Sequence, residues 1–176
     1  MIKSLFIIYG KSGVGKTTLI NELCRRCNFE TISSYTTRPI REGCISENHI
    51  FVSEDEFNAI SNKALTFIFS GYHYCITYSQ LNSADIFGLP PNAILGLYKK
   101  NNIISRPINL IYVKASDQMR YDRMIKRGNK PEWIKNRMVE EQPVFKAVEG
   151  YANKIIYNDD FNKCVEELER YINYGF

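Results

Sequence analysis

The apolar residues at the start of the chain form one short, nearly continuous run that is followed by a helical pattern. Residues 2–9 are almost all apolar and end at Gly10, which predicts a parallel strand buried on both faces. From Lys16 to Cys27 the apolar residues recur at the spacing of one helix face. The chain is therefore expected to begin with a strand, a glycine-containing turn and a helix.

Short β-type patterns dominate residues 29–77. Strands are expected over residues 30–35, 49–52, 65–69 and 72–77. Between the second and third of these strands, Ser53 and Glu56 have the spacing of a capping box, which predicts a short helix through Ile60. This part of the chain is expected to form a β-rich insertion.

After residue 77 the pattern returns to strands alternating with helices. Buried strands are expected over residues 92–98, 108–114 and 154–157. Ser116 is a suitable N-cap for a basic helix that reaches Arg127, and a second helix from about Pro131 is expected to be disturbed at Pro143. An amphipathic helix over residues 161–172 ends the pattern. This alternation predicts an α/β fold with a parallel β-sheet core.

The composition is that of a globular protein. The chain has 176 residues, of which 44% are hydrophobic and 24% charged, and this fits a single domain. No apolar run is long enough to span a membrane. The short run before Gly10 leads directly into a glycine motif, unlike a secretory signal peptide. We therefore expect a cytoplasmic protein with no membrane partner.

The five cysteines predict neither disulfides nor a metal site, because their number is odd and their spacing is not paired. Cys24 and Cys27 lie three residues apart on the first predicted helix. A zinc site there would need a second pair of ligands, and the only histidines are His49 and His73. Free cysteine behaves as a small apolar residue, so these thiols are interpreted as part of the core.

The turn after the first strand carries the clearest chemical signal. Residues 10–17 read Gly-Lys-Ser-Gly-Val-Gly-Lys-Thr and fit the phosphate-loop pattern G-x-x-x-x-G-K-[ST], with a strand before and a helix after. Glycines let successive backbone N–H groups point at phosphate oxygens, and the helix adds the positive end of its dipole. Lys16 is expected to contact the β- and γ-phosphates, and the Thr17 hydroxyl suits Mg²⁺. The residues expected to bind ATP are Gly10, Ser12, Gly13, Val14, Gly15, Lys16, Thr17 and Thr18.

A second signal lies in residues 34–43, which read Ser-Tyr-Thr-Thr-Arg-Pro-Ile-Arg-Glu-Gly. Arg38 and Arg41 are three residues apart beside several hydroxyl groups. A planar guanidinium can hold a phosphate through two hydrogen bonds, so the pair suits the phosphate of an acceptor substrate. Composition alone also allows two solvated arginines in a loop.

With these residues the chain resembles the guanylate kinase family. Residues 34–43 are similar to that family's S-x-T-T-R-x-x-R-x-G run, and Phe-Val-Ser at 51–53 precedes an acidic helix start, as in the family. Residues 70–74 are similar to G-N-Y-Y-G, and residues 123–128 to R-L-x-x-R-G. Residues 134–138 and 156–160 also match, so the resemblance extends from the phosphate loop almost to the end of the chain.

The resemblance implies a P-loop kinase with three parts. These are a core (residues 1–28, 78–116 and 153–176), a β-rich acceptor-binding insertion (29–77) and a helical lid (about 117–152). It implies that the acceptor's phosphate is bound by Ser34, Arg38, Arg41 and Tyr74. It also implies that Arg127 and Arg137 are lid arginines, that Asn158 lies beside the adenine of ATP, and that the catalytic residues are Lys16, Arg38, Arg127 and Arg137.

This reading also accounts for the net charge of +4, much of which lies in residues 120–137. A basic stretch can indicate nucleic-acid binding. Arginines supplied by a closing lid instead stabilise the charge that spreads over a phosphoryl group during transfer. We therefore expect no nucleic-acid partner.

The chain departs from the family where guanine is recognised. The family uses a glutamate before the G-N-Y-Y-G run, a small hydroxyl after it and an aspartate on the next strand. Here the matching positions are Leu65 or a neighbour, Ile76 or Thr77, and the acid-free residues 93–98. A guanine edge with unpaired donors loses about 1–3 kcal/mol per group, so weak discrimination for guanine is expected.

The run Ser46-Glu47-Asn48-His49 is similar to one in ribose 1,5-bisphosphate phosphokinase, which also lacks those acids. His49 is either an acceptor ligand or a strand histidine without one, and His73 is interpreted as structural. The sequence thus predicts an ATP- and Mg²⁺-dependent kinase, monomeric or homodimeric, acting on a small-molecule phosphate monoester. Nucleoside monophosphates are the leading class. A sugar-phosphate kinase is the first alternative, and a non-catalytic phosphopeptide-binding module is the second.

Overall fold

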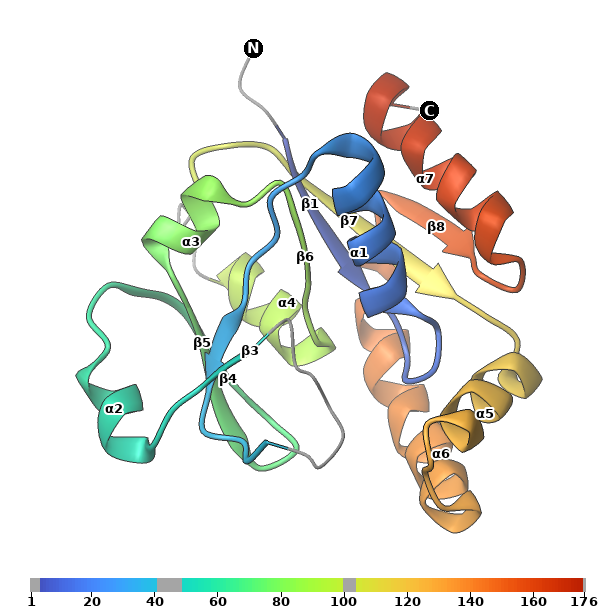
Figure 1. Cartoon of the computed structure of the whole chain (residues 1–176), viewed down its shortest axis with the longest axis horizontal. Helices are drawn as coiled ribbons and strands as arrows, with labels where there is room; N and C mark the ends of the chain where they lie inside the picture. Colours follow the sequence, from blue (N-terminus) through green and yellow to red (C-terminus); the bar gives the residue numbers. More distant parts are fainter. Residues whose placement is uncertain (1–3, 41–48, 100–103, 176) are drawn as a thin grey trace.

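The structure is a computed structural model, and it describes residues 4–40, 49–99 and 104–175. Within these ranges the strands form two four-stranded sheets, with the orders β6-β1-β7-β8 and β3-β2-β5-β4 (Figure 1). Arg41 lies outside the described residues, as do Ser46, Glu47 and Asn48. None of the helices in the described part of the chain is long and apolar enough to cross a bilayer.

The first sheet is entirely parallel and forms the core of the protein. Its strands are β1 (Leu5–Tyr9), β6 (Ile86–Gly88), β7 (Ile108–Lys114) and β8 (Lys154–Tyr157). Every residue of β1 is buried, as its continuous apolar sequence predicts for a central strand. The strand ends of this sheet therefore lie at one edge, where β1 leads into the phosphate loop.

Alternate residues of β1 face two separate apolar layers. Phe6 and Ile8 pack in a cluster with helices α1 (Lys16–Cys27) and α7 (Phe161–Tyr174). Leu5, Ile7 and Tyr9 belong to the opposite layer, which includes residues of α4 (Pro91–Lys99) and α6 (Pro131–Val148). The sheet is thus covered by helices on both faces, which confirms the predicted α/β core (Figure 1).

The second sheet is mixed and forms the predicted insertion. It contains β2 (Ser34–Thr36), β3 (His49–Phe51), β4 (Lys63–Phe69) and β5 (Tyr72–Thr77). β2 pairs parallel with β3 and antiparallel with β5, and β4 pairs antiparallel with β5. The short helix α2 (Glu54–Ala59) begins with the predicted capping box, because the Ser53 and Glu56 side chains each accept a hydrogen bond from the other's backbone N–H.

Helices α5 (Asp117–Lys126) and α6 pack together beside the phosphate loop (Figure 1). Ser116 caps α5 as predicted, its side chain accepting from the backbone N–H of Met119. A short 3₁₀ turn, η1 (Glu149–Tyr151), connects α6 to β8. The remaining helix, α3 (Tyr78–Ser83), follows β5 and is capped by Thr77.

The predicted strand over residues 92–98 is wrong, since this segment is helix α4. The strand that pairs with β1 is β6, which the sequence analysis missed. Short apolar runs do not distinguish a buried strand from a buried helix by periodicity alone. Pro91 decides in favour of the helix, because proline at the first helical position has the required φ and needs no hydrogen-bond partner for its nitrogen.

Two further expectations need correction. α6 continues through Pro143 to Val148 without a break. Pro143 cannot bond the carbonyl of Val139, but both residues lie on the exposed side of the helix, where water can replace that bond. The strand expected over residues 30–35 is shorter and shifted, covering Ser34–Thr36.

Candidate functional site

The phosphate loop is packed so closely against its neighbours that its glycines cannot carry side chains. Gly13 has φ 82°, and a Cβ there would lie 2.6 Å from the Arg120 carbonyl oxygen. Gly15 has φ 92°, and its Cβ would lie 2.6 Å from Nδ2 of Asn158. Both conformations are left-handed and favour glycine. The loop is therefore held between β1, α5 and the end of β8 with its backbone as the binding surface.

Lys16 begins α1, and its ammonium group points back into the loop. Its Nζ donates to the carbonyl oxygens of Gly10 at 2.6 Å and Lys11 at 3.2 Å. Burial lowers the pKa of Lys16 to about 8, and the nearby Glu141 carboxylate opposes this shift. Thr17 and Thr18, in the first turn of the same helix, are exposed. The first turn of α1 thus presents one partly buried cation and two accessible hydroxyl groups.

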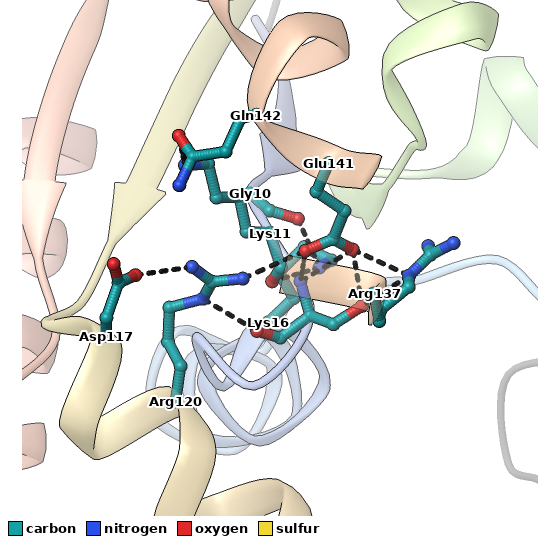
Figure 2. A network of polar contacts seen from close by, with 9 residues as sticks. Gly10, Lys11, Lys16, Asp117, Arg120, Arg137, Glu141 and Gln142 are labelled. Carbon is teal, nitrogen blue, oxygen red and sulfur yellow. Dashed lines mark hydrogen bonds and ion pairs between the residues drawn. The ribbon is translucent and has the colours of Figure 1, made fainter. Parts of the chain in front are cut away.

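A carboxylate from α6 occupies the donors of this loop, as Figure 2 shows. Both Glu141 oxygens accept from the backbone N–H of Ser12, at 3.1 and 3.0 Å, and one accepts from Ser12 Oγ at 2.5 Å. Nη2 of Arg120 and Nε of Arg137 each reach the carboxylate at 2.9 Å. One buried anion therefore receives hydrogen bonds from a backbone amide, a hydroxyl and the Arg120 guanidinium, and it forms an ion pair with Arg137.

Sequence reasoning missed two arginines of α5 that hold the loop. Arg120 is buried, and its Nε donates to the Ser12 carbonyl oxygen at 2.9 Å. Nη2 of Arg123 donates to the Asn158 carbonyl oxygen at 2.8 Å, and its Nη1 lies within 3.4 Å of two loop carbonyls. Their positions three residues apart on a basic helix were the available signal, because such residues share one face.

The two predicted lid arginines are placed differently. Arg137 donates to Ser12 Oγ at 3.2 Å, and its guanidinium lies 5.2 Å from the centre of the Phe69 ring in β4. Arg127 is exposed at the end of α5, and its side chain makes no hydrogen bond or ion pair with the residues that the structure describes. Its charge nevertheless contributes to the lowered pKa of Lys16.

Asn158 contacts the phosphate loop directly. Its Nδ2 donates to the Val14 carbonyl oxygen at 2.7 Å, while its buried Oδ1 accepts no hydrogen bond within the described part of the chain. A buried oxygen without a donor is uncommon. Asn158 therefore has one acceptor left for another group at this end of the sheet.

The acceptor residues predicted in the second sheet come together around one tyrosine. Ser34 Oγ lies 2.9 Å from Nδ1 of His49, and the His49 ring is 5.5 Å from that of Tyr74. Tyr74 stacks on Phe67 with ring centres 5.3 Å apart. The structure thus unites Ser34, His49 and Tyr74, which belong to three adjacent strands, β2, β3 and β5.

Arg38 follows β2 and lies beside the same group. Its guanidinium is 5.8 Å from the centre of the Phe51 ring, and its buried Nε has no hydrogen-bond partner among the described residues. His73, interpreted as structural, pairs instead with Glu54 at 3.1 Å on the surface. Arg38 is the cation of this second site that remains available for an anion.

The positions aligned with guanine recognition are apolar or already occupied. Leu65 and Ile76 are buried in the main core layer, and Thr77 caps helix α3. Residues 93–98 are helical, and the strand that pairs with β1 on this side, β6, also contains no acid. Asp85 precedes this strand and accepts from the backbone N–H of Glu30.

The hydrogen-bond donors of the phosphate loop suit phosphate groups well, but the loop offers few protein ligands for Mg²⁺. The loop already holds a carboxylate with the kinds of donors that hold phosphate oxygens. Among the residues that the structure describes, no group of three or more His, Cys, Asp and Glu side chains could hold a metal ion. Mg²⁺ would therefore depend on the Thr17 hydroxyl, phosphate oxygens and water, which this ion commonly retains.

In sequence, the chain is similar to known guanylate kinases. No family model matches the chain. The guanylate kinase of Chlamydia pneumoniae is 27% identical over 174 residues, which cover 94% of this chain and 84% of that enzyme. The guanylate kinase of Neisseria gonorrhoeae is 28% identical over 183 residues, covering 97% of this chain and 87% of that enzyme.

A solved structure agrees with the sequence comparison. The crystal structure of guanylate kinase from Anaplasma phagocytophilum superimposes with a TM-score of 0.72 over 99% of this chain and 86% of that one, at 15% identity. That likeness concerns the fold, which combines a parallel four-stranded sheet with a separate mixed sheet. The chain is therefore a distant homologue of the guanylate kinases over nearly its whole length and has their α/β fold.

Proposed function

We propose that this protein is an ATP-dependent kinase that transfers the γ-phosphate to a small phosphate monoester, with nucleoside monophosphates the leading class. The observation that carries the proposal is the position of Arg137. Its guanidinium group contacts Ser12 of the phosphate loop on one side and Phe69 of the second sheet on the other. A phosphoryl group passing from the loop to an acceptor on that sheet would develop its charge beside this cation.

The chemistry of the loop supports the donor half of the reaction. Ser12 N–H, Lys16 and the surrounding arginines form a cationic cradle with more donors than one carboxylate can use. The buried Asn158 Oδ1 has no donor among the described residues, and the sequence resemblance implies that Asn158 lies beside the adenine. We assign ATP binding to residues 10–18 together with Asn158, and Mg²⁺ binding to Thr17.

The second sheet supports the acceptor half. Ser34, Arg38, His49 and Tyr74 offer hydroxyl, guanidinium and imidazole groups within one contiguous cluster. Arg41, assigned to the same phosphate, lies outside the described residues. We expect direct in-line transfer without a covalent enzyme intermediate, because this arrangement supplies cations rather than a nucleophile.

The proposal divides the chain as the sequence suggests. Residues 1–28, 78–116 and 153–176 form the core, residues 29–77 the acceptor region and residues 117–152 the lid, which contains α5 and α6. Closure of the lid would bring Arg127 from its exposed position to the loop and exclude water from the transfer. We also propose that the enzyme is cytoplasmic and that it is a monomer or a homodimer.

A sugar-phosphate kinase is the second candidate, and the Ser34–His49 contact favours it. His49 belongs to the run that is similar to ribose 1,5-bisphosphate phosphokinase, and its ring contacts both Ser34 and Tyr74. Under either candidate His49→Ala should weaken use of the acceptor more than binding of ATP. The non-catalytic module is less well supported, because such a module has no need of an intact phosphate loop.

The test is ADP release from ATP with a panel of acceptors: GMP, dGMP, AMP, UMP, dTMP and ribose 1,5-bisphosphate. Lys16→Ala should abolish transfer to every acceptor while leaving the circular dichroism spectrum unchanged, since Lys16 bonds only loop carbonyls. Lys163→Ala, on the exposed face of α7, is the matched control and should retain full activity. Near-normal turnover by Lys16→Ala would refute the kinase mechanism.

A further inference from the structure

Glu141 is the one acidic side chain in the described residues that bonds directly to the phosphate loop. It lies one helical turn after Arg137 on α6 and is buried. Its carboxylate accepts hydrogen bonds from the Ser12 N–H and the Ser12 hydroxyl and forms ion pairs with Arg120 and Arg137 (Figure 2). These donor types are the ones that a phosphate group would require.

Lys16 is a cation of the loop on which the Glu141 charge acts. Its ammonium group donates to the carbonyl oxygens of Gly10 and Lys11 and not to the Glu141 carboxylate. The Glu141 charge is the largest influence that favours the protonated form of this lysine. A neighbouring bond, from Lys11 Nζ to Oε1 of Gln142 at 3.0 Å, holds the next residue of α6 against the loop as well.

We propose that Glu141 is an internal competitor for the nucleotide's phosphate: its carboxylate fills the phosphate position when no nucleotide is bound, and binding must displace it. Displacement frees one donor of Arg120 for the incoming phosphate, and it frees Arg137 for the charge that develops during transfer. The inference rests on the proposed function only in requiring that the loop binds phosphate. It adds a regulatory contact between the lid helix and the donor site.

The energetic argument follows from the linked equilibrium. A phosphate group binds only the fraction of molecules whose loop is free, so its apparent dissociation constant is raised by the inverse of that fraction. Hydrogen bonds from the Ser12 N–H, the Ser12 hydroxyl and Arg120, together with the ion pair to Arg137, keep the free fraction small. Removing the negative charge from residue 141 should therefore strengthen phosphate binding, even though it removes a partner from buried Arg120.

The experiment measures binding of inorganic pyrophosphate and of ADP, without magnesium or acceptor, by titration calorimetry. Glu141→Gln should lower the dissociation constant for pyrophosphate about tenfold or more, because the amide competes less well with an anion. Glu140→Gln is the matched control, since Glu140 is exposed on the same helix and carries the same charge. It should bind like the wild type.

A second measurement on the wild type does not depend on a folded variant. Carbodiimide coupling of carboxylates to an amine, read by mass spectrometry, should modify Glu141 slowly in the free protein and faster with saturating pyrophosphate. Glu140 should react equally in both states. Persistent protection of Glu141 with pyrophosphate bound would overturn the inference, as would unchanged or weaker binding by a folded Glu141→Gln.

The outcomes also separate this inference from the proposed function. Pyrophosphate binding that is unaffected by Glu141→Gln contradicts the competitor role and leaves the phosphate loop intact as a binding site. A failure of wild type and variant alike to bind pyrophosphate or ADP contradicts both. Tighter pyrophosphate binding by the variant, with no kinase activity in the wild type, supports the competitor role and contradicts the proposed reaction.

Discussion

At the scale of single residues, Arg127 and Arg137 carry the same charge but differ in their contacts. Arg137 is bonded to Ser12 and Glu141, whereas the Arg127 side chain is free at the end of α5 with respect to the described residues. In the proposed closed state both would meet charge that develops during transfer. Each change to alanine should then lower kcat at least about a hundredfold with little effect on the KM for ATP.

Thermal unfolding distinguishes the two arginines further. Arg137→Ala should lower Tm, because it leaves the buried Glu141 with one cation fewer, while Arg127→Ala should leave Tm unchanged. Arg25→Ala, which removes an exposed arginine of α1 paired with Glu22, is the control for kinetics. A rise in KM alone for either variant would make that arginine a ground-state ligand.

The burial of Cys164 in the core predicts how the stability of the protein depends on pH. Cys164 lies on the buried face of α7, and this burial raises the pKa of its thiol to about 12, from an ordinary value near 9.0. The folded protein therefore keeps a proton that the unfolded chain loses, so the thiol's contribution to the free energy of unfolding declines as pH rises from about 9 to about 12. Tyr112, whose pKa is raised to about 12, acts in the same direction.

We expect urea unfolding between pH 8 and pH 11 to show this decline in the wild type and a smaller decline in Cys164→Ala. Iodoacetamide at pH 8 should modify half-buried Cys24 and Cys27 before Cys164. Equal rates for the three thiols in the native protein would show that Cys164 is not buried as described.

At the scale of elements, α4 carries a residue that its own helix does not favour. Gly96 lies inside α4, and a Cβ there would meet Cδ1 of Leu65 at 3.8 Å, an ordinary van der Waals distance. Gly96→Ala should therefore stabilise the protein by about 0.5–1 kcal/mol through helix propensity, a rise in Tm of about 1–4 °C. Differential scanning calorimetry measures it.

Gly13→Ala is the contrasting variant. Its left-handed φ and the 2.6 Å approach of the Arg120 carbonyl oxygen leave no room for a methyl group, so this change should lower Tm. A loss of stability in Gly96→Ala comparable to that in Gly13→Ala would contradict the helical assignment of residues 91–99.

The elements that the sequence predicted well are those whose signals are local. β5, β7, β8 and α1 have the expected bounds, and the capping box at Ser53 starts α2. α4 was mistaken for a strand because a short apolar run fits either structure, and β6 was missed because it contains three residues. Local patterns thus predicted the architecture but not every element at the sheet edge.

The site divides in the same way. The phosphate loop was predicted from its motif, because each motif residue has a chemical reason for its spacing, whereas Ser34, His49 and Tyr74 were predicted from the resemblance to known kinases, and the structure brings these three together. Glu141 and Arg120 belong to no motif, and their roles depend on how α5 and α6 pack on the loop. Only the i, i+4 spacing of Arg137 and Glu141 on one helix face hinted at their ion pair.

At the scale of the whole molecule, the proposed acceptor region combines a polar part with an apolar part. The polar part holds Arg38, Ser34 and His49, whereas the aligned guanine-reading positions Leu65 and Ile76 are buried in the core. A site built in this way should bind a phosphate strongly and a base weakly. Selectivity for one base should then be far below the 10⁴–10⁵ that a hydrogen-bonding site can reach, on the order of tenfold to a hundredfold.

The most direct test of this account is kcat/KM for GMP, dGMP, AMP, UMP, dTMP and ribose 1,5-bisphosphate under identical conditions with saturating ATP. The account predicts phosphoryl transfer to several of the phosphate monoesters, with GMP preferred by about a hundredfold at most. Transfer to GMP alone, with the other nucleotides at least about ten thousand times poorer, would contradict it. Such a result would mean that residues other than Leu65 and Ile76 recognise guanine.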